Sequence, residues 1–220
     1  MGMIYFISGI DTDAGKTVAV GLMARYLMKE GVRVITAKLV QTGNDGFSED
    51  LLKHRAMMGV EAFEEDKEGL TAPQIFKFPS SPHLAAKQEN RVVDLDKIRT
   101  AMRLLAARYE VVLVEGAGGL AVPLTEEVLT IDWVAQEQWP LILVTSGKLG
   151  SLNHTILSLE AASRRHILLA GIVYNYCATA HPIIDSDTPR MIGKWTDRLV
   201  RIPHVDFSAL PEIDFSPIFE

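Results

Sequence analysis

Short apolar runs alternate along the chain with segments in which apolar residues recur at helical spacing. Residues 3–8 form a run of apolar, β-branched and aromatic side chains, which predicts a buried strand. From Thr17 to Lys29 the apolar residues follow a helical period, and Gly31 comes next as a stop signal, so a helix is predicted there. The same patterns predict further strands at 32–40, 109–119, 140–147 and 167–175, and further helices at 48–58, 94–108 and 151–165.

This alternation predicts the fold class. Strands that are apolar throughout are covered on both faces, and strands that alternate with helices form parallel sheets. We therefore expect an α/β fold with a single doubly wound, mostly parallel sheet flanked by helices, in one domain spanning residues 1–220. Residues 59–90 contain three prolines, at 73, 79 and 82, and are expected to form loops with short pieces of structure. The chain after Arg198 is also expected to be loop-like.

Composition narrows the class of partner. The 220 residues are 48% hydrophobic and 23% charged, as in ordinary globular proteins. The net charge is −6 and there is no dense block of Lys and Arg, which argues against nucleic acid or an anionic membrane as the main partner. The single cysteine, Cys177, excludes an intrachain disulfide. No secretory signal pattern and no apolar run of about 20 residues is found, so a cytoplasmic protein is expected.

The first candidate site is the turn between the predicted strand 3–8 and the predicted helix 17–29. It ends in Gly15-Lys16-Thr17, the end of a nucleotide-binding P-loop, although the strict pattern needs a glycine at position 10 and the chain has Gly9 and Ile10. A strand, a turn and a helix start are the context in which backbone N–H groups point at phosphate oxygens. We therefore expect a phosphate loop one residue longer than usual, with Lys16 neutralising phosphate charge, Thr17 binding Mg²⁺, and a fold of P-loop NTPase type.

Other candidates lie where predicted strands end. Glu115 ends a strand and precedes four small residues, which favours a ligand-site role, because ligands gather at the carboxyl ends of parallel strands. Lys38 also closes a strand, and local sequence favours equally an anion-binding lysine and one that extends to solvent. Asp50 could be a metal ligand, but an acidic residue is also common in the first turn of a helix, where it interacts favourably with the helix dipole. Residues 146–155 have the form of a second anion-binding helix start, or of an ordinary turn.

Six motifs together carry a family resemblance. They are GIDTDAGKT, AKLVQTG, SSPHLAA, VEGAGGLAVPL, DWVAQEQWPLILV and GKLGSLNHT, with a weaker match at IPHV, residues 202–205. In this order they resemble the dethiobiotin synthetases, whose loop has the form G-x-D-T-x-x-G-K-T, over residues 4 to 175. The resemblance implies a homodimer with an active site across the interface, and no nucleic acid or membrane partner. It also implies conversion of 7,8-diaminononanoate, CO₂ or bicarbonate and ATP with Mg²⁺ into dethiobiotin, ADP and phosphate, through a carbamate and a carbamic-phosphoric mixed anhydride.

The resemblance also implies residue roles. By this resemblance, the catalytic residues are Lys38, Lys16 and Thr12, and the metal ligands are Thr17, Asp50 and Glu115. Substrate contacts fall to Thr42 and, from the partner subunit, to the start of the predicted helix at Leu149, Gly150, Ser151, Leu152 and Asn153. Nucleotide contacts fall to the phosphate loop, the glycine-rich strand end and an adenine pocket, namely Asp13, Ala14, Gly15, Lys16, Thr17, Val18, Glu115, Gly116, Ala117, Gly118, Asn175, Tyr176, Pro203, His204 and Val205.

The chain departs from the family pattern in three places. Leu39 stands where the family usually has proline, which is expected to leave the backbone at Lys38 less restrained. Asp13 stands where glutamate is common, and Tyr176 precedes a tail that is hard to align. An alternative function is a dimeric P-loop ATPase of the partitioning or positioning type, but such proteins carry a lysine where this chain has Asp11. An amido-ligase using glutamine-derived ammonia would need a glutaminase domain with a Cys nucleophile.

Overall fold

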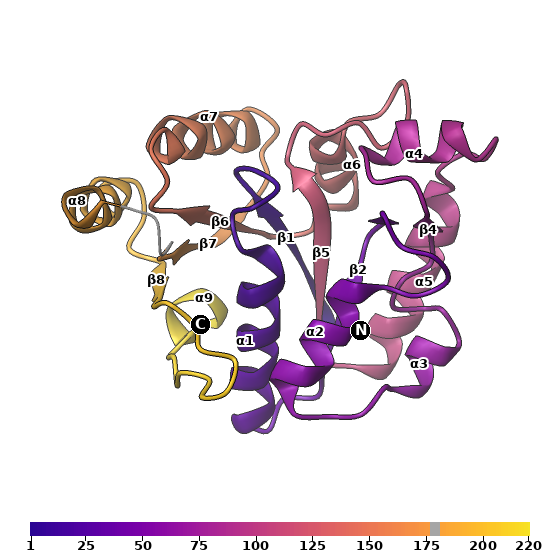
Figure 1. The fold of residues 1–220 in the computed structure, drawn as a ribbon, viewed down its shortest axis with the longest axis horizontal. Helices are drawn as coiled ribbons and strands as arrows, with labels where there is room; N and C mark the ends of the chain where they lie inside the picture. The colour runs from indigo at the N-terminus through magenta and orange to yellow at the C-terminus, as the bar shows by residue number, and fades with distance from the viewer. Residues whose placement is uncertain (177–180) are drawn as a thin grey trace.

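The computed structural model describes residues 1–176 and 181–220, and its centre is a parallel sheet of six strands (Figure 1). The strand order is β2-β5-β1-β6-β7-β8, and every neighbouring pair is parallel. The strands are β1 (Met3–Gly9), β2 (Val34–Lys38), β5 (Val111–Gly119), β6 (Leu141–Ser146), β7 (Leu169–Asn175) and β8 (Leu199–Ile202). The predicted fold class, a mostly parallel sheet flanked by helices, is confirmed.

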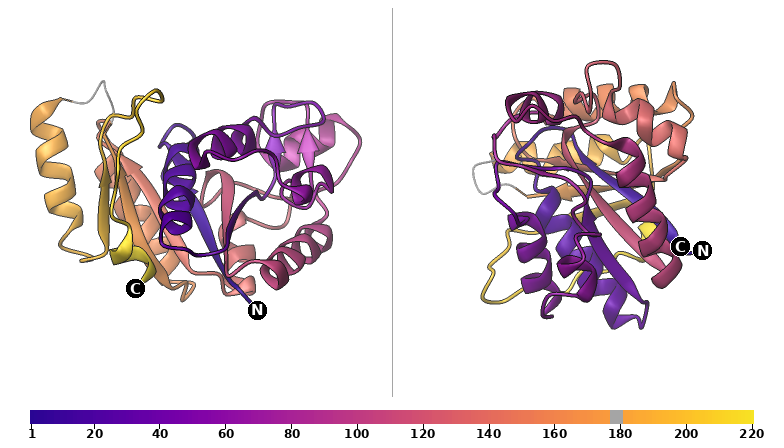
Figure 2. Two further views of the ribbon diagram at one scale, coloured as in Figure 1. Left: turned by 90° about the horizontal axis from the view of Figure 1, so that it is seen from below. Right: turned by 90° about the vertical axis from the view of Figure 1, so that its right-hand side faces the viewer.

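Helices cover both faces of the sheet, as the views in Figure 2 show. Successive residues of a strand point to opposite faces, so Phe6 belongs to one buried cluster and Ile7 to the other. The Phe6 side packs against α5 (Leu95–Arg108), α6 (Thr130–Glu137) and part of α7 (Ser151–Ser163). The Ile7 side packs against α1 (Lys16–Lys29), α2 (Glu49–Met58) and α9 (Ser216–Phe219). Helix α8 (Pro182–Ile192) packs through Ile192 near β7.

The region from 59 to 90 has the short elements that its prolines predicted. They are α3 (Glu64–Lys67), β4 (Ile75–Phe76) and α4 (Pro82–Gln88). Strand β4 pairs in parallel with β3 (Gln41–Thr42) to make a small second sheet beside the main one. This small sheet holds the chain that follows β2 close to the carboxyl end of the main sheet.

The prediction of a loop-like chain after Arg198 holds for residues 203–215 and was wrong at its two ends. Residues 199–202 form the edge strand β8, and Phe215 and Ile218 of the tail are buried against α1 and β7. Helices α6 and α8 were not predicted from periodicity either. Strand β8 is short and helix α8 contains Pro189, so neither β8 nor α8 offers a long regular pattern in the sequence. Cys177 lies outside the described residues.

The topology brings the carboxyl ends of β1, β2 and β5 to one edge of the sheet. Lys38 is the register partner of Glu115, and Glu115 is also the partner of Ile7 in β1. The loop after β1 therefore begins next to two charged residues that are 77 positions apart in the chain. Within residues 1–176 and 181–220, no helix combines the length and the apolar character needed to span a bilayer.

Candidate active site

The segment between β1 and α1 wraps tightly around the side chain of Lys16. Its Nζ donates hydrogen bonds to the backbone carbonyls of Asp11 and Thr12, both at 3.0 Å. Gly15 precedes the helix with φ of 92°, a left-handed conformation that favours glycine, and a Cβ there would lie 1.9 Å from Nδ2 of Asn175. Burial lowers the pKa of Lys16 to about 8, and the negative charge of Glu115 opposes that shift. The ammonium is thus held inside a loop at a helix N-terminus.

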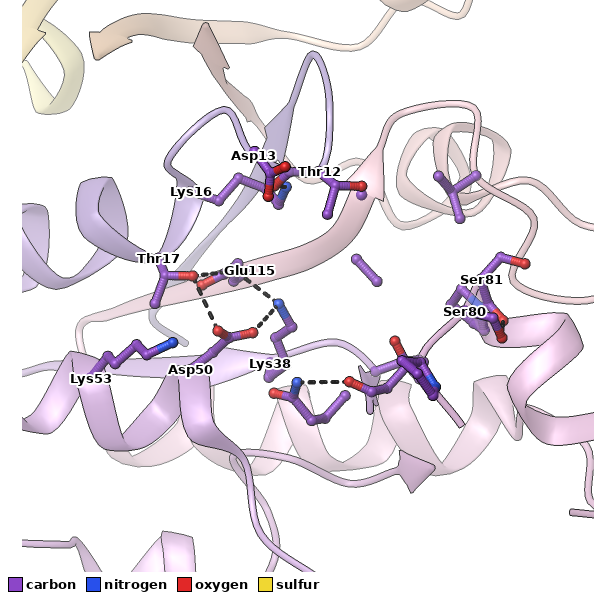
Figure 3. Close-up of a pocket in the computed structure, with 18 residues that line it drawn as sticks. Thr12, Asp13, Lys16, Thr17, Lys38, Asp50, Lys53, Ser80, Ser81 and Glu115 are labelled. Atoms are coloured by element: carbon purple, nitrogen blue, oxygen red, sulfur yellow. Dashed lines mark hydrogen bonds and ion pairs between the residues drawn. The ribbon is translucent and has the colours of Figure 1, made fainter. Parts of the chain in front are cut away.

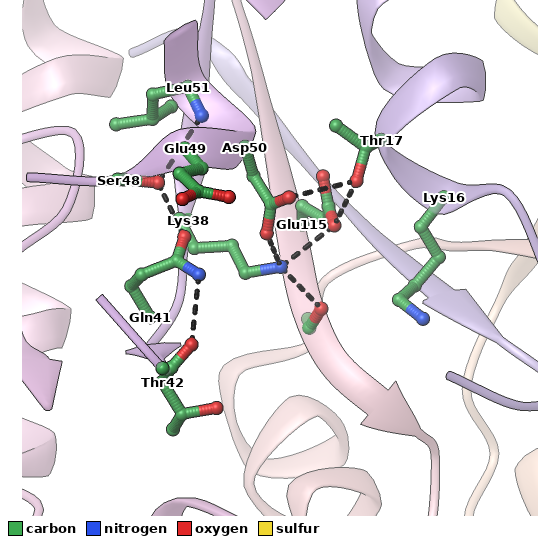
Figure 4. Close-up of polar contacts among 12 residues, drawn as sticks. Lys16, Thr17, Lys38, Gln41, Thr42, Ser48, Glu49, Asp50, Leu51 and Glu115 are labelled. Atoms are coloured by element: carbon green, nitrogen blue, oxygen red, sulfur yellow. Dashed lines mark hydrogen bonds and ion pairs between the residues drawn. The ribbon is translucent and has the colours of Figure 1, made fainter. Parts of the chain in front are cut away.

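Lys38 is buried and lies between two carboxylates (Figure 4). Its Nζ lies 2.8 Å from Oε1 of Glu115 and 2.6 Å from Oδ2 of Asp50, and it donates to the carbonyl of Gly116 at 3.3 Å. Burial alone would lower the pKa of Lys38, but the charges of Glu115 and Asp50 outweigh it and the pKa is raised. Of the two interpretations left open by the sequence, the lysine that extends to solvent is excluded.

Helix α2 places Asp50 beside the loop. Oγ of Ser48 accepts a hydrogen bond from the amide of Leu51 at 3.2 Å, which caps the helix and puts Asp50 in its first turn. The Thr17 hydroxyl lies 3.2 Å from Oδ1 of Asp50 and 3.1 Å from Oε1 of Glu115. Three residues from three separate elements, α1, α2 and β5, thus converge on one point.

The chemistry of this convergence suits a small hard cation. Thr17, Asp50 and Glu115 offer only oxygen atoms, and Mg²⁺ is commonly bound by one or two carboxylates together with phosphate oxygens and water. Burial alone would raise the pKa of Glu115, but the charge of Lys38 and the hydrogen bond from His54 outweigh burial. The pKa is therefore below its ordinary value, and the carboxylate is ionised. In the described part of the chain no cluster of three or more His, Cys, Asp or Glu side chains is arranged as a self-sufficient metal site. One hydroxyl and two carboxylates would leave the remaining positions around Mg²⁺ to phosphate oxygens and water.

A cavity of about 680 Å³ opens in front of these groups (Figure 3). Thr12, Asp13 and Thr42 line it, as do Ala117 and Gly118 at the end of β5. The cavity also has polar lining to which the sequence assigned no role, at Lys53, Ser80 and Ser81. The two serines belong to the SSPHLAA motif, and Lys53 lies one turn beyond Asp50 in α2, with its side chain directed toward Asp50 and Thr17 in Figure 3.

At Leu39, where the chain departs from the family pattern, hydrogen bonds hold the backbone in place. The amide of Leu39 donates to the carbonyl of Glu115 at 2.9 Å, and the amide of Lys38 donates to the carbonyl of Thr71 at 2.7 Å. Proline has no N–H and could not make the first of these bonds. The hydrogen bonding between β2 and β5 therefore continues one residue past Lys38.

The candidate adenine-pocket residues lie at the carboxyl ends of β7 and β8. Asn175 donates to the carbonyl of Ala14 at 3.3 Å, so the end of β7 touches the phosphate loop directly. Residues 203–205 follow β8, the neighbour of β7 in the sheet. The ring of Tyr176 packs edge-to-face on Tyr174 with centroids 5.0 Å apart, in the cluster that includes Ile192 of α8. The contacts of the Tyr176 ring are therefore with the α8 side of β7.

The candidate substrate segment 149–153 starts α7 and lies beside the phosphate loop. It is not part of the lining of the large cavity within this chain, whereas Leu149 and Ser151 share a small pocket with Asp11 and His154. Leu149 is 83% exposed, and Gly150 has φ of 93°. Oγ of Ser151 is buried without a hydrogen-bond partner in the described residues. The exposed Leu149 leaves this helix start open to a group from outside the chain, whereas the Ser151 hydroxyl is buried beneath it.

His54 is a second residue of the site, besides Lys53, that no sequence signal indicated. His54 is fully buried, and its Nε2 lies 2.9 Å from Oε2 of Glu115. Its partner is 61 positions away, and His54 has neither a second histidine at helical spacing nor a recognisable motif around it. The pair forms only because α2 packs on β2, the neighbour of β5 in the sheet.

Comparisons with known proteins agree on one family. The family model of the AAA domain AAA_26 matches residues 4–207. ATP-dependent dethiobiotin synthetase BioD 2 of Pasteurella multocida (strain Pm70) is 48% identical over 198 residues, which cover 90% of this chain and 93% of that protein. The protein of the same name from Haemophilus influenzae (strain ATCC 51907 / DSM 11121 / KW20 / Rd) is 53% identical over 175 residues, 80% of this chain and 92% of that protein.

Solved structures are similar in fold. A ParA family ATPase from Chlorobium tepidum TLS has a TM-score of 0.56 and 17% identity, over 94% of this chain and 86% of that one. At this identity the similarity extends to the arrangement of strands and helices alone.

Proposed function

Because the chain belongs to the ATP-dependent dethiobiotin synthetases, we propose that it forms dethiobiotin, ADP and phosphate from 7,8-diaminononanoate, CO₂ and ATP. One observation supports this chemistry above the others. Lys38, Glu115, Asp50 and Thr17 form a charged cluster that meets the phosphate loop at the floor of an open cavity. A reaction of bound small molecules with a phosphate needs positioned charge at such a place more than it needs a protein nucleophile.

The proposed reaction has three steps. One amine nitrogen of the diamine attacks CO₂ and loses a proton, which gives a carbamate. A carbamate oxygen then attacks the γ-phosphorus of ATP, and the bond to ADP breaks, which leaves a carbamic-phosphoric mixed anhydride. The second amine attacks the carbonyl carbon, loses a proton and expels phosphate as the five-membered urea ring closes.

Two lysines would provide most of the positive charge that stabilises the phosphates and the carbamate. Lys16 in the loop would face the β- and γ-phosphates, and Lys38 would lie between the carbamate and the transferring phosphoryl group. Positive charge fixed in place before the reaction stabilises the charge that develops on the transferring oxygens. Thr12 and Thr42, which line the same cavity, are proposed to hold the carbamate and diamine end of the substrate.

Thr17, Asp50 and Glu115 are proposed to hold Mg²⁺ together with the ATP phosphates. When bound there, the ion would neutralise part of the phosphate charge. The remaining contacts to ATP are assigned to the loop and to the strand ends. The amides of residues 13–18 would wrap the phosphates, Gly116 to Gly118 would line the boundary between nucleotide and substrate, and Asn175, Tyr176 and residues 203–205 would form the base pocket. The hydrogen bond from Asn175 to the loop supports the placement of that pocket.

The enzyme is proposed to act as a homodimer in the cytoplasm, where ATP is available. The amides of Leu149 to Asn153 in one subunit would receive the substrate carboxylate at the active site of the other. The exposure of Leu149 supports this arrangement, because it leaves the start of α7 available to a second subunit.

A labelled assay tests the function. Purified protein is incubated with MgATP, 7,8-diaminononanoate and ¹³C-bicarbonate, and the products are followed by mass spectrometry. We expect dethiobiotin with the label in its ureido carbonyl, and ADP release that depends on both the diamine and bicarbonate. ADP release that is stimulated by DNA or lipid vesicles and not by the diamine would instead indicate an ATPase of the partitioning type.

A further inference from the structure

A chain of buried polar groups runs from α3 to Glu115 on the side away from the cavity. Asp66 accepts two hydrogen bonds from Arg55, at 2.8 Å from Nε and 2.7 Å from Nη2. Nη1 of Arg55 donates to the Thr36 hydroxyl at 2.6 Å. That hydroxyl lies 3.0 Å from Nδ1 of His54, whose Nε2 lies 2.9 Å from Oε2 of Glu115. Arg55, Thr36, His54 and Glu115 are all buried.

The direction of each hydrogen bond in this chain follows from the donors available. The Glu115 carboxylate has only acceptors, so Nε2 of His54 carries the hydrogen of that bond. Arg55 has only donors, so the Thr36 oxygen accepts from Arg55 and its own hydrogen is free to point at Nδ1. From Arg55 onward the bonds therefore point toward Glu115, whereas the two bonds to Asp66 point away from it and anchor the guanidinium, and the imidazole is held with its hydrogen on Nε2.

This series of hydrogen bonds divides the two oxygens of Glu115 between two sets of partners. Oε2 faces His54, whereas Oε1 faces the cavity, with the Lys38 ammonium at 2.8 Å and the Thr17 hydroxyl at 3.1 Å (Figure 4). If Lys38 moves toward a carbamate or a phosphate, Oε1 loses a partner and Oε2 keeps its own. The carboxylate then cannot rotate without leaving His54 Nε2 and its own oxygen unpaired in a buried place.

We infer that His54 is a positioning residue that holds Glu115 toward the nucleotide independently of Lys38, and that Thr36, Arg55 and Asp66 fix the orientation of its ring. The inference rests on the proposed role of Glu115 in binding the metal that accompanies the nucleotide. Partners of this kind behind a metal ligand typically change metal affinity by about ten- to a hundredfold when they are removed. A buried histidine that only fills space would have no such effect on metal-dependent binding.

Calorimetric titration of ADP, once with excess Mg²⁺ and once with EDTA, tests the inference without substrate turnover. We expect His54→Leu, which keeps apolar bulk and removes both ring nitrogens, to weaken binding of MgADP by about tenfold or more. Metal-free ADP should bind within about twofold of the wild type, because the loop amides and Lys16 are untouched. His54→Gln, which retains an N–H donor, should recover most of the MgADP affinity.

Two further variants separate positioning from stability. Thr36→Val removes the hydroxyl at nearly constant volume and lies behind His54, so it should weaken MgADP binding and leave ADP binding in EDTA unchanged. Met57→Ala is the matched control, because Met57 is buried on the same helix and faces Gly21 of α1 in the apolar cluster on that side. It should lower the melting temperature without changing either affinity. If His54→Leu does not fold, the inference is tested by the MgADP affinities of Thr36→Val, which should be lowered, and of His54→Gln, which should be close to the wild-type value.

The ring nitrogens give an independent spectroscopic readout. In wild-type protein, ¹⁵N correlation spectra of the histidine rings should show the hydrogen of His54 on Nε2, and Thr36→Val should shift the Nδ1 resonance, because that nitrogen loses its hydrogen-bond donor. A hydrogen on Nδ1 in the wild type, or wild-type MgADP affinity in both His54→Leu and Thr36→Val, would overturn the inference. A protein that shows the expected metal-dependent pattern and forms no dethiobiotin would contradict the proposed function alone.

Discussion

At the scale of single residues, Lys38 connects stability with chemistry. Its ammonium is the cation nearest to the buried carboxylate of Glu115 and also contacts Asp50. Removing one partner of a buried ion pair leaves the other charge uncompensated, and this is more damaging than replacing both partners. The two roles can therefore be separated by substitution.

Lys38→Met should lower the rate of dethiobiotin formation by well over tenfold and the free energy of unfolding by about 3 kcal/mol. The double variant Lys38→Met, Glu115→Gln should regain most of the lost stability, because neither side chain is then charged, and should remain inactive. Denaturant unfolding and the mass-spectrometric assay measure the two effects. Substantial activity in the stable double variant would remove the Lys38 ammonium from the mechanism.

The residues of the site differ in how far the sequence could predict them. Lys16, Thr17, Lys38 and Glu115 were recognisable because each closes a strand or opens a helix, and parallel strands bring such positions to one edge. For Lys38 and Asp50 the position alone still left two interpretations, because a lysine at a strand end can extend to solvent and an acidic residue in a first turn has a local explanation. The pairing of His54 with Glu115 depends on the distance between two elements that are far apart in the chain, and no periodicity encodes that distance.

At the scale of elements, the position of α2 depends on its first turn. Ser48 caps the helix through the amide of Leu51, and the side chain two residues after the cap is the Asp50 carboxylate that meets Thr17 and Lys38. Helix α5 offers a comparison away from the site, because the Asp94 carboxylate caps it through the amide of Lys97 at 2.8 Å. Both caps should contribute to stability, and only the first should affect the site.

Ser48→Ala and Asp94→Ala should each lower the free energy of unfolding by about 1 kcal/mol, the usual effect of losing an N-cap. Only Ser48→Ala should also raise the KM for MgATP, by about three- to tenfold, since a frayed first turn displaces Asp50. Steady-state kinetics and denaturant unfolding of the two variants test this. An equal change of KM in both variants would mean that general loss of stability is responsible.

Elements were predictable from the sequence where their patterns were long. The strands β1, β5, β6 and β7 and the helices α1, α5 and α7 each carry a sustained period of 2 or 3.6 or an unbroken apolar run. Strand β8 has four residues and is completed only by pairing with β7, and α6 has eight residues. In such short segments tertiary contacts decide the structure, and propensity alone does not.

At the scale of the whole molecule, Asp66 couples the fold to pH. Burial raises the pKa of Asp66, but the hydrogen bonds from Arg55 and Thr71 outweigh it, so the pKa is lowered from its ordinary value of 3.8. The unfolded chain then binds a proton at a pH where the folded chain does not, and stability rises with pH in that window. The contribution of Asp66 is complete above about pH 4 and is lost as the pH falls toward its folded pKa.

Asp66→Asn should therefore lower the free energy of unfolding by about 2 kcal/mol at pH 7, the usual value of hydrogen bonds to a charged group. The difference from wild type should shrink progressively below about pH 4. Glu64→Gln, in an exposed pair with Lys67 on the same helix, should differ little from wild type at any pH. Urea unfolding at pH 3, 5 and 7 would contradict the assignment if the Asp66→Asn difference stayed constant.

The proposed active site across a dimer interface predicts complementation between inactive subunits. Lys38→Met disables the part of a site that is formed by β2 and the phosphate loop. Asn153→Glu places a negative charge on the exposed first turn of α7, where it should repel the substrate carboxylate and leave the fold intact. In a two-fold symmetric dimer that holds one subunit of each kind, one of the two sites combines an unaltered loop with an unaltered α7. Random mixing in equal amounts places half of the dimers in this class, so about a quarter of the wild-type activity should return.

The two variants are to be unfolded together, refolded and assayed for dethiobiotin, beside each variant refolded alone. Activity near a quarter in the mixture, with little in either separate sample, requires that one subunit supplies α7 to the other's cavity. If the mixture stays as inactive as its parts while size-exclusion chromatography shows mixed dimers, each chain uses its own α7. A mixture that remains monomeric would remove the shared site together with the homodimer.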